Sequence, residues 1–338
     1  MNSVLLVRLS AMGDLVQSLG SVQSLRAARP DARITVVTQQ PWAPLLEHVD
    51  GIDKVVRFDR RGGLSALWQV RRELRQERFD VAIDLQGNWK SALITRLARA
   101  TTRIGMTAEW RQEPRSKLLL QRTVACAATP HPARAAWELV KQVAPEAAFC
   151  HPQLTATEAE LADERVVLKT LGIDCDAPFR VIVVTDPADP RALRPTAVDA
   201  FAEGMPTVLL LGPGEQGLQQ ANGIVLRHQR GEVRRMIALG ALVAAVGGEV
   251  LGPDQGATHV LLAAGARGRV FFGSQDPRRT SPPSAQPFVA AGELACRPCR
   301  ARQCSHPDGV VCMALAPDSA QAIDAGLPPA GAVGAGPW

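Results

Sequence analysis

The sequence predicts an α/β protein built from two Rossmann-like domains whose parallel sheets face a central cleft. First, short continuous apolar runs, typical of strands buried on both faces of a parallel sheet, alternate with segments of helical periodicity. Second, this alternation ends near residue 143 and starts again near residue 181. Third, a length of 338 residues suits two domains of ordinary size better than one core. In such folds ligands meet the carboxyl ends of the strands.

The first half of the chain contains four expected strands with helical segments between them. The stretch 64–76 combines an apolar face with an outer face rich in Arg and Glu, as in an amphipathic helix. A further helix-like stretch covers 133–143. Apolar side chains at helical spacing occupy positions 15, 19, 22 and 25, and the expected strands are 4–7, 34–37, 55–58 and 81–83.

The second half is expected to form the other α/β domain. Because a polar stretch between residues 150 and 178 separates the halves, we expect domains at 1–160 and 176–315. Residues 327–338, rich in Gly, Pro and Ala, are expected to form a disordered tail. The expected strands of this half are 181–184, 208–211, 243–246 and 270–272.

Composition narrows the class of protein. Hydrophobic residues make up 46% of the chain, yet no apolar run approaches the roughly 20 residues of a membrane-spanning helix. The first residues lack the layout of a secretory signal, because Arg8 and Asp14 interrupt a short apolar run, so we expect a cytoplasmic protein. The net charge of +5 suits anionic partners, but with 4% aromatic residues no basic patch interleaved with aromatics indicates nucleic-acid binding.

The stretch GPDQGATH, residues 252–259, forms a polar turn between two apolar segments. A helix that begins near Ala257 would point free N–H groups and the positive end of its dipole at an anion, and Gly256 would let backbone approach closely. Thr258 and His259 could add donors in the first helical turn. This pattern predicts a phosphate cradle, and its alternative is a tight connection in an α/β domain.

The turn after the first expected strand reads Ser-Ala-Met-Gly-Asp. Gly13 can adopt backbone conformations closed to other residues, and Asp14 stands at the carboxyl edge of the strand. Asp14 is therefore a candidate functional carboxylate, with a helix N-cap as the alternative.

Polar and basic residues also follow two other expected strands. Gln86 and Lys90 bring hydrogen-bonding capacity and positive charge to the end of the fourth strand, where helix capping is again the competing explanation. Arg60 and Arg61 follow the third strand and either meet anionic groups or are solvated.

Four of the seven cysteines cluster near the C-terminus. They are spaced C-x2-C-x4-C-x7-C, with His306 inside the cluster. In a cytoplasmic protein this favours a structural zinc site over disulfides, and the alternative is a loop of reduced thiols. The cluster consists of Cys296, Cys299, Cys304 and Cys312.

Taken together, several ordered stretches resemble glycosyltransferase family 9, the ADP-heptose:lipopolysaccharide heptosyltransferases. The resemblance covers most of the chain and weakens between about 150 and 245. The stretches are VLLVRLSAMGDLVQSLGSVQSLRAARPDARITVV, FDVAIDLQGNWKSALITRLA, RIGM, HPARAAWELV, GPDQGATHVLLAAG, FFGSQDPRRTSP and the segment 296–313.

The resemblance implies a GT-B architecture, with a last helix at about 316–326 packed back on the first domain. It implies inverting transfer of a heptose or related sugar from an ADP-activated donor, bound by the C-terminal half, to a lipopolysaccharide core or similar glycan held by the N-terminal half. No catalytic metal or cofactor is implied. An acceptor embedded in the inner membrane would bring the enzyme into peripheral contact with that membrane.

The resemblance also implies roles for individual residues. Asp14 matches the general base, and Asp254 matches a motif residue that fixes the turn or contacts the donor sugar. Glu215 matches an acidic residue near the donor. The acceptor side comprises Gly13, Gln86, Lys90, Arg60 and Arg61, and the donor phosphates would meet Gly256, Ala257, Thr258 and His259.

The chain departs from the family pattern on the donor side. Where the family has the Lys of a Lys-x-Trp-Pro segment this chain has Ala192, and Arg194 replaces the Trp. Arg191 or Arg194 could supply the missing charge, although Arg and Lys are not equivalent at a phosphate. Gln255 replaces a Ser or Thr. A donor site remodelled for another nucleotide sugar explains these changes, and so does a non-catalytic binding or scaffold protein with a degraded donor site.

A dinucleotide-dependent oxidoreductase is a distant third hypothesis. The segment after the first strand, residues 8–14, lacks the GxGxxG spacing that a dinucleotide-binding turn needs.

Overall fold

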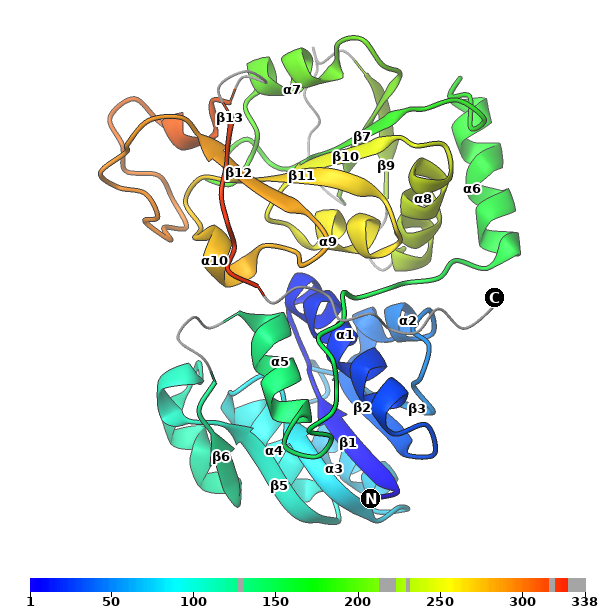
Figure 1. The fold of residues 1–338 in the computed structure, drawn as a ribbon, viewed down its shortest axis with the longest axis vertical. Helices are drawn as coiled ribbons and strands as arrows, with labels where there is room; N and C mark the ends of the chain where they lie inside the picture. Colours follow the sequence, from blue (N-terminus) through cyan, green and yellow to red (C-terminus); the bar gives the residue numbers. More distant parts are fainter. Residues whose placement is uncertain (127–130, 213–222, 229–231, 316–319, 328–338) are drawn as a thin grey trace. The chain divides into compact units, whose positions relative to one another are not determined.

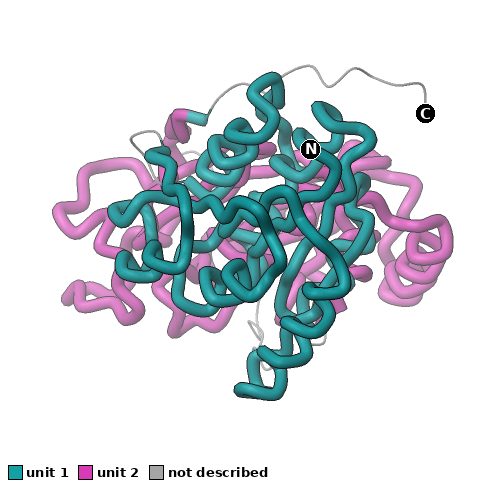
Figure 2. The backbone as a smooth tube through the Cα atoms, turned by 90° about the horizontal axis from the view of Figure 1, so that it is seen from below, with its two compact units in different colours: residues 1–152, 327–338 teal, residues 153–326 magenta. Residues whose placement is uncertain are grey.

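The computed structural model describes residues 1–126, 131–212, 223–228, 232–315 and 320–327. The chain forms two compact units (Figure 2). Unit 1 comprises residues 1–152 and 327–338, and unit 2 comprises residues 153–326. Within the described ranges, no helix is both long and apolar enough to cross a membrane.

Unit 1 contains a six-stranded parallel sheet in the order β3-β2-β1-β4-β5-β6 (Figure 1). This is the strand order of a Rossmann fold, and it puts β1 and β4 side by side at the centre. Val7, the last residue of β1, pairs with Asp84, the last residue of β4, so the turns that follow these strands are neighbours. The strands are β1 (Ser3–Val7), β2 (Arg33–Gln39), β3 (Lys54–Phe58), β4 (Phe79–Asp84), β5 (Ala100–Met106) and β6 (Arg122–Val124).

Helices cover both faces of this sheet. Leu5 and Val7 of β1 join a core with residues of α3 and α4, and alternate side chains of a strand point to the opposite face. On that opposite face α1 packs against α5. The helices are α1 (Met12–Ala28), α2 (Ala43–Leu46), α3 (Gly63–Leu74), α4 (Trp89–Leu97) and α5 (Pro132–Val140), with 3-10 turns η1 (Gln40–Trp42), η2 (Ala108–Trp110) and η3 (Pro114–Leu119).

Unit 2 repeats the strand order of unit 1 and adds one antiparallel edge strand. Its sheet has the order β13-β12-β11-β10-β7-β8-β9, in which β13 alone of these seven runs antiparallel to its neighbour. The strands are β7 (Arg180–Val184), β8 (Thr207–Leu211), β9 (Ile224–Arg227), β10 (Glu249–Pro253), β11 (Arg267–Phe272), β12 (Gln286–Ala290) and β13 (Ala320–Ala322).

The helices of unit 2 pack on this sheet and on one another. Contacts link α6 to α8 and α8 to α9, and α9 follows β10 directly. The helices are α6 (Glu158–Thr170), α7 (Pro195–Ala202), α8 (Val233–Ala245), α9 (Gly256–Ala263) and α10 (Pro277–Thr280), with the 3-10 turn η4 (Val311–Met313).

Two expectations for unit 2 differ from the structure. The strand expected at 243–246 is wrong, because α8 continues to Ala245 and the central strand is β10. Both faces of α8 carry buried apolar residues, and a short apolar run in such a helix has no periodicity that separates it from a strand.

The segment expected to form a helix at about 316–326 contains β13 instead. β13 pairs with β12 in unit 2, where it covers backbone groups of a strand edge that would otherwise lie unpaired. Residues 316–319, and all of the expected tail 327–338 except Leu327, lie outside the described residues.

Candidate functional site

The turn after β1 presents the carboxylate of Asp14. Asp14 lies in the first turn of α1, and the N-cap position is Ala11, so Asp14 does not cap the helix. Its Oδ2 lies 2.7 Å from Nη2 of Arg8, which is itself buried and donates from Nη1 to the Leu85 carbonyl. The side chain of Asp14 remains 27% exposed, and within the described residues Oδ1 has no partner. One oxygen is therefore held and the other is available to a ligand.

Gly13 lies beside Asp14 inside α1, with ordinary helical backbone. It is absent from the glycines of positive φ, so this position does not use the conformational freedom of glycine.

The neighbouring turn after β4 is built around a buried ion pair. Asp84 Oδ2 lies 2.5 Å from Nη2 of Arg111, and both side chains are completely buried. Asp84 Oδ1 accepts hydrogen bonds from the backbone N–H groups of Gln86 and Gly87, each at 3.0 Å. Asp84 therefore fixes the backbone of this turn.

Gln86 connects the two turns. Its Oε1 accepts from the Leu9 backbone N–H at 2.8 Å, and its Nε2 donates to Ser10 Oγ at 3.1 Å. Gln86 does not cap the helix that follows, because the N-cap of α4 is Asn88, whose side chain forms a capping box there. Gln86 thus holds the turn that carries Asp14, while Lys90 in the first turn of α4 is exposed.

Arg60 and Arg61 lie in the loop between β3 and α3 and are both exposed. The backbone N–H of Arg61 donates to Asp59 Oδ1 at 2.8 Å, but neither guanidinium has a partner in the portion of the chain described. These side chains are free to meet an anion, and no hydrogen bond or ion pair of the described residues joins them to the Asp14 turn.

In unit 2 the stretch 252–259 connects β10 to α9, as expected. α9 begins at Gly256, one residue before the expected start, and its N-cap, Gln255, makes no side-chain capping bond. The backbone N–H groups of Gly256, Ala257 and Thr258 find no acceptor among the residues described, as in an open helix N-terminus. This end of α9 has the geometry of an anion site.

The side chains of the turn hold it in shape. Thr258 Oγ1 donates to the Pro253 carbonyl at 2.9 Å, and His259 Nε2 lies 3.0 Å from Asp254 Oδ1. Asp254 Oδ2 accepts from the Thr280 hydroxyl at 2.8 Å. Both carboxylate oxygens of Asp254 are thus engaged within unit 2, which favours the turn-fixing role over contact with a donor sugar.

Arg191 brings a guanidinium to the same turn. Its Nε and Nη2 donate to the two carboxylate oxygens of Asp189 at 3.0 and 2.7 Å, and its Nη1 donates to the Asp254 carbonyl at 3.3 Å. The Asp189 hydrogen bonds raise the pKa of Arg191. Burial works against the charge of Asp189, but hydrogen bonds from Arg191 outweigh it and lower the pKa of that carboxyl. A charged pair is therefore fixed beside the N-terminus of α9.

The other donor-side candidates lie differently. Arg194 precedes α7 and donates from Nη1 to the Pro187 carbonyl at 3.2 Å, without a bond to the turn. Ala192, at the position of the family lysine, is completely buried, so its side chain faces the core. Glu215 lies outside the described residues.

The cysteine cluster contains free thiols. Three of its members are exposed and Cys312 is buried. Burial and the neighbouring thiols raise the pKa of Cys312. In the described part of the chain, no group of three or more His, Cys, Asp or Glu side chains could hold a metal ion, so the geometry lends the zinc hypothesis no support.

The sequence pattern singles out Asp14 and the α9 turn as candidates, but it does not single out Arg8, Arg111 or Thr280. Arg8 carried a usable signal, since it directly follows β1 in the same turn as Asp14. Arg111 and Thr280 reach their partners across 27 and 26 residues, and no local pattern marks such contacts.

Part of the chain matches a known protein family, and proteins of assigned function resemble it. The model of glycosyltransferase family 9 (heptosyltransferase) matches residues 67–179. The lipopolysaccharide core heptosyltransferase OpsX of Haemophilus influenzae is 23% identical over 38% of this chain and 37% of its own length. Lipopolysaccharide heptosyltransferase 1 of Pseudomonas aeruginosa is 22% identical over 90% of this chain and 87% of its own. The chain thus spans just over a third of the first relative and most of the second.

Solved structures agree on the fold. A glycosyl transferase of family 9 from Veillonella parvula superimposes with a TM-score of 0.72 at 17% identity and covers 84% of each chain. Escherichia coli heptosyltransferase WaaC, solved with ADP-2-deoxy-2-fluoro heptose, has a TM-score of 0.64 at 20% identity and covers 86% of this chain and 94% of its own. The predicted α/β fold of GT-B class is confirmed. The family match, the relatives and the fold agree, and the chain is similar to glycosyltransferase family 9, the heptosyltransferase family, with the family model matching residues 67–179.

Proposed function

We propose that the chain is an inverting glycosyltransferase that moves a heptose or a related sugar from an ADP-activated donor to a lipopolysaccharide core or similar glycan acceptor. The observation that carries the proposal is the open N-terminus of α9 with the guanidinium of Arg191 fixed beside it. The relatives named heptosyltransferases support the choice of reaction, and the WaaC complex supports the choice of donor.

The α9 turn suits the diphosphate of a nucleotide sugar. When the glycosidic bond to the donor breaks, negative charge grows on the departing diphosphate, and preorganised donors stabilise that charge. The free N–H groups of Gly256, Ala257 and Thr258 and the positive end of the helix dipole provide such donors. Arg191 places a guanidinium beside these N–H groups, although Asp189 balances its charge.

Asp14 suits the acceptor half of the reaction. The acceptor hydroxyl attacks the anomeric carbon on the face opposite the leaving diphosphate, and its proton must pass to a base as the new bond forms. Arg8 holds Oδ2 of Asp14, and Oδ1 is left to accept that proton. Gln86 keeps the Asp14 turn in place through Leu9 and Ser10.

The non-catalytic alternative finds no support in the comparisons, since the relatives named above are heptosyltransferases. A family lysine is missing at Ala192, but Arg191 supplies positive charge from the adjacent position. A remodelled donor site therefore explains the departures better than a degraded one.

The test is transfer from ADP-heptose to a heptose-free core acceptor, measured together with ADP affinity by calorimetry. Asp14→Asn should lower kcat by about 100-fold or more, because general-base catalysis contributes that much, while the Kd for ADP stays unchanged. Asp50→Asn, at an exposed carboxylate of the same unit, is the matched control and should retain full turnover.

Two results would contradict the proposal. Retained turnover in Asp14→Asn would remove the general base. If ADP gives no binding heat and no nucleotide sugar of a panel is turned over, the results would favour a protein without a donor site.

A further inference from the structure

The outer face of α3 in unit 1 carries large apolar and basic side chains that the proposed reaction does not use. The inner face of the helix packs Ala66, Val70 and Leu74 into the core. On the outer face Leu64 is 76% exposed and Trp68 is 64% exposed. Exposing a tryptophan and a leucine one turn apart is unfavourable in water, so this face needs an explanation.

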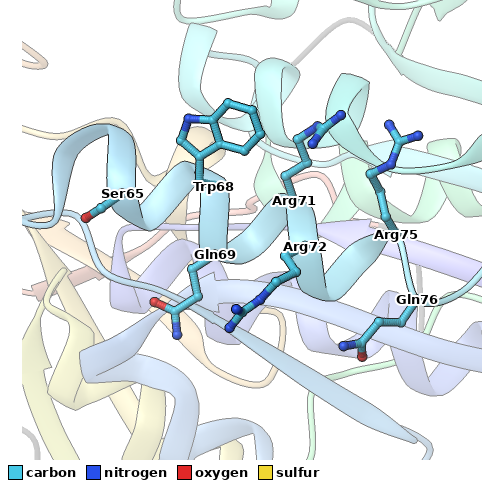
Figure 3. A pocket seen from close by; sticks show the side chains of 7 residues that line it. All are labelled: Ser65, Trp68, Gln69, Arg71, Arg72, Arg75 and Gln76. Atoms are coloured by element: carbon cyan, nitrogen blue, oxygen red, sulfur yellow. The ribbon is translucent and has the colours of Figure 1, made fainter.

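Basic side chains continue the same face toward the C-terminal end of the helix. Figure 3 shows Trp68, Arg71 and Arg75 in one row, with Arg72 in a second row between two glutamines. Together with Ser65 these side chains form one open surface on the outside of the helix. All of these residues come from α3 and the two residues that follow it, so the surface projects outward and is not recessed between elements.

The cations of this face have no carboxylate partners. Within the described residues, Arg71, Arg72 and Arg75 form no ion pair, and the guanidinium of Arg71 lies 5.0 Å from the centre of the Trp68 ring. The nearby acids are occupied elsewhere, because Glu73 and Glu77 both pair with Lys54.

A fourth cation joins them at the end of the helix. Arg99 is exposed and donates from Nη1 to the carbonyl oxygen of Arg75 at 3.4 Å. The surface is therefore strongly positive at one end and apolar at the other.

We propose that this α3 face, residues 64–75 on the outer side, docks unit 1 onto an anionic lipid bilayer. Trp68 and Leu64 would enter the interfacial layer, where a tryptophan ring is favourable, while the arginines meet lipid phosphates. A projecting surface with unpaired cations fits a flat, negatively charged sheet of headgroups better than it fits a peptide, which needs a recessed groove. Membrane docking does not depend on the proposed function, but its use does, since docking would bring the enzyme to a lipid-linked acceptor.

The test is sedimentation of the whole protein with vesicles of phosphatidylcholine alone and of phosphatidylcholine mixed with phosphatidylglycerol. We expect binding to the anionic vesicles only, and weaker binding at higher salt because salt screens the arginines. Each arginine near an anionic surface contributes about 1 kcal/mol, about fivefold in partitioning, so Arg71→Gln/Arg72→Gln/Arg75→Gln should weaken binding about 100-fold. The control variant removes three exposed charges from unit 2 and is Arg165→Gln/Lys169→Gln/Arg267→Gln. It should bind the vesicles as strongly as the unchanged protein does.

A second readout reports on the tryptophan itself. Vesicles should shift the tryptophan emission of the unchanged protein to shorter wavelength, and Trp68→Phe should lose that shift while melting at an unchanged temperature. Transfer to a soluble, lipid-free core acceptor should be unaffected in the triple variant. That assay separates failure of docking from failure of the proposed reaction.

Three outcomes would overturn the proposal. The first is equal binding to neutral and anionic vesicles, and the second is equal binding by the triple variant and the control. The third is that the protein binds no vesicles but forms a dimer in solution, and that the triple variant is a monomer. The last outcome would assign the face to a second copy of the chain.

Discussion

Replacing Arg111 by Leu should destabilise unit 1 by about 3 kcal/mol, because it leaves the Asp84 carboxylate buried without its cation. Breaking a buried pair from one side costs about 3–5 kcal/mol. Both side chains are 0% exposed, and the guanidinium also donates from Nε to Ser116 Oγ at 2.8 Å. The backbone donors of Gln86 and Gly87 remain on the other carboxylate oxygen, so we expect the lower end of that range.

Scanning calorimetry measures this effect. For a unit of the size of unit 1, about 3 kcal/mol lowers the melting temperature by roughly 6–12 °C. Arg115→Leu, at an exposed arginine four residues away, is the matched control and should change the free energy of unfolding by less than about 0.5 kcal/mol. Equal shifts for the two variants would refute the reasoning.

The double variant Asp84→Leu/Arg111→Leu separates pairing from burial. Removing both charges abolishes the unpaired carboxylate, so stability should partly return. Full recovery is not expected, because the N–H groups of Gln86 and Gly87 lose their acceptor. A double variant less stable than Arg111→Leu alone would show that the carboxylate is not the source of the cost.

The remaining predictions concern the donor turn, the acid limb of stability and the thiols. Arg191→Ala should raise the Kd for ADP about 10- to 100-fold, because it removes a hydrogen bond from a charged group. Arg194→Ala should leave this Kd nearly unchanged, and calorimetry that shows the larger effect for Arg194→Ala would contradict the assignment. Burial opposes the charge of Glu164, but His228 and Arg235 outweigh it and lower its pKa below the usual 4.5. Its stabilising contribution is complete above that value and is lost as the pH falls through the lowered pKa, so Glu164→Gln should flatten that part of an acid unfolding curve. A thiol reagent should quickly modify three cysteines of the native protein, namely Cys296, Cys299 and Cys304, and protection of these thiols together with one bound zinc per chain would revive the metal site.

Much of the fold could be predicted from local pattern because its central strands are buried on both faces. Residues 4–7, 181–184 and 208–211 are continuous apolar runs, and 34–37 is apolar except for the buried Thr35; each lies in an interior strand of its sheet. The shortest edge strands lack this signal. β6 and β13 are three residues long and largely exposed or half-buried, so nothing in the sequence separates them from loops.

The site was predictable where it depends on position along the chain. Asp14 and the α9 turn both follow a strand and begin a helix, and that position alone marks them. The roles of Thr258 and His259 were not predictable, because both side chains turn back to Pro253 and Asp254 once the helix forms. Local sequence shows which groups can donate but not which acceptors reach them first.

The donor-side departures from the family pattern connect to one another in the structure. Gln255, in place of a Ser or Thr, directs its Nε2 toward Asp189 Oδ2 at 3.4 Å. The same Asp189 holds Arg191, which in turn donates to the carbonyl of Asp254. Gln255, Asp189 and Arg191 thus restrain the same helix N-terminus together. This mutual support is the physical reason to expect a rebuilt donor site, in which a clamped arginine supplies the charge that Ala192, buried in the core, cannot.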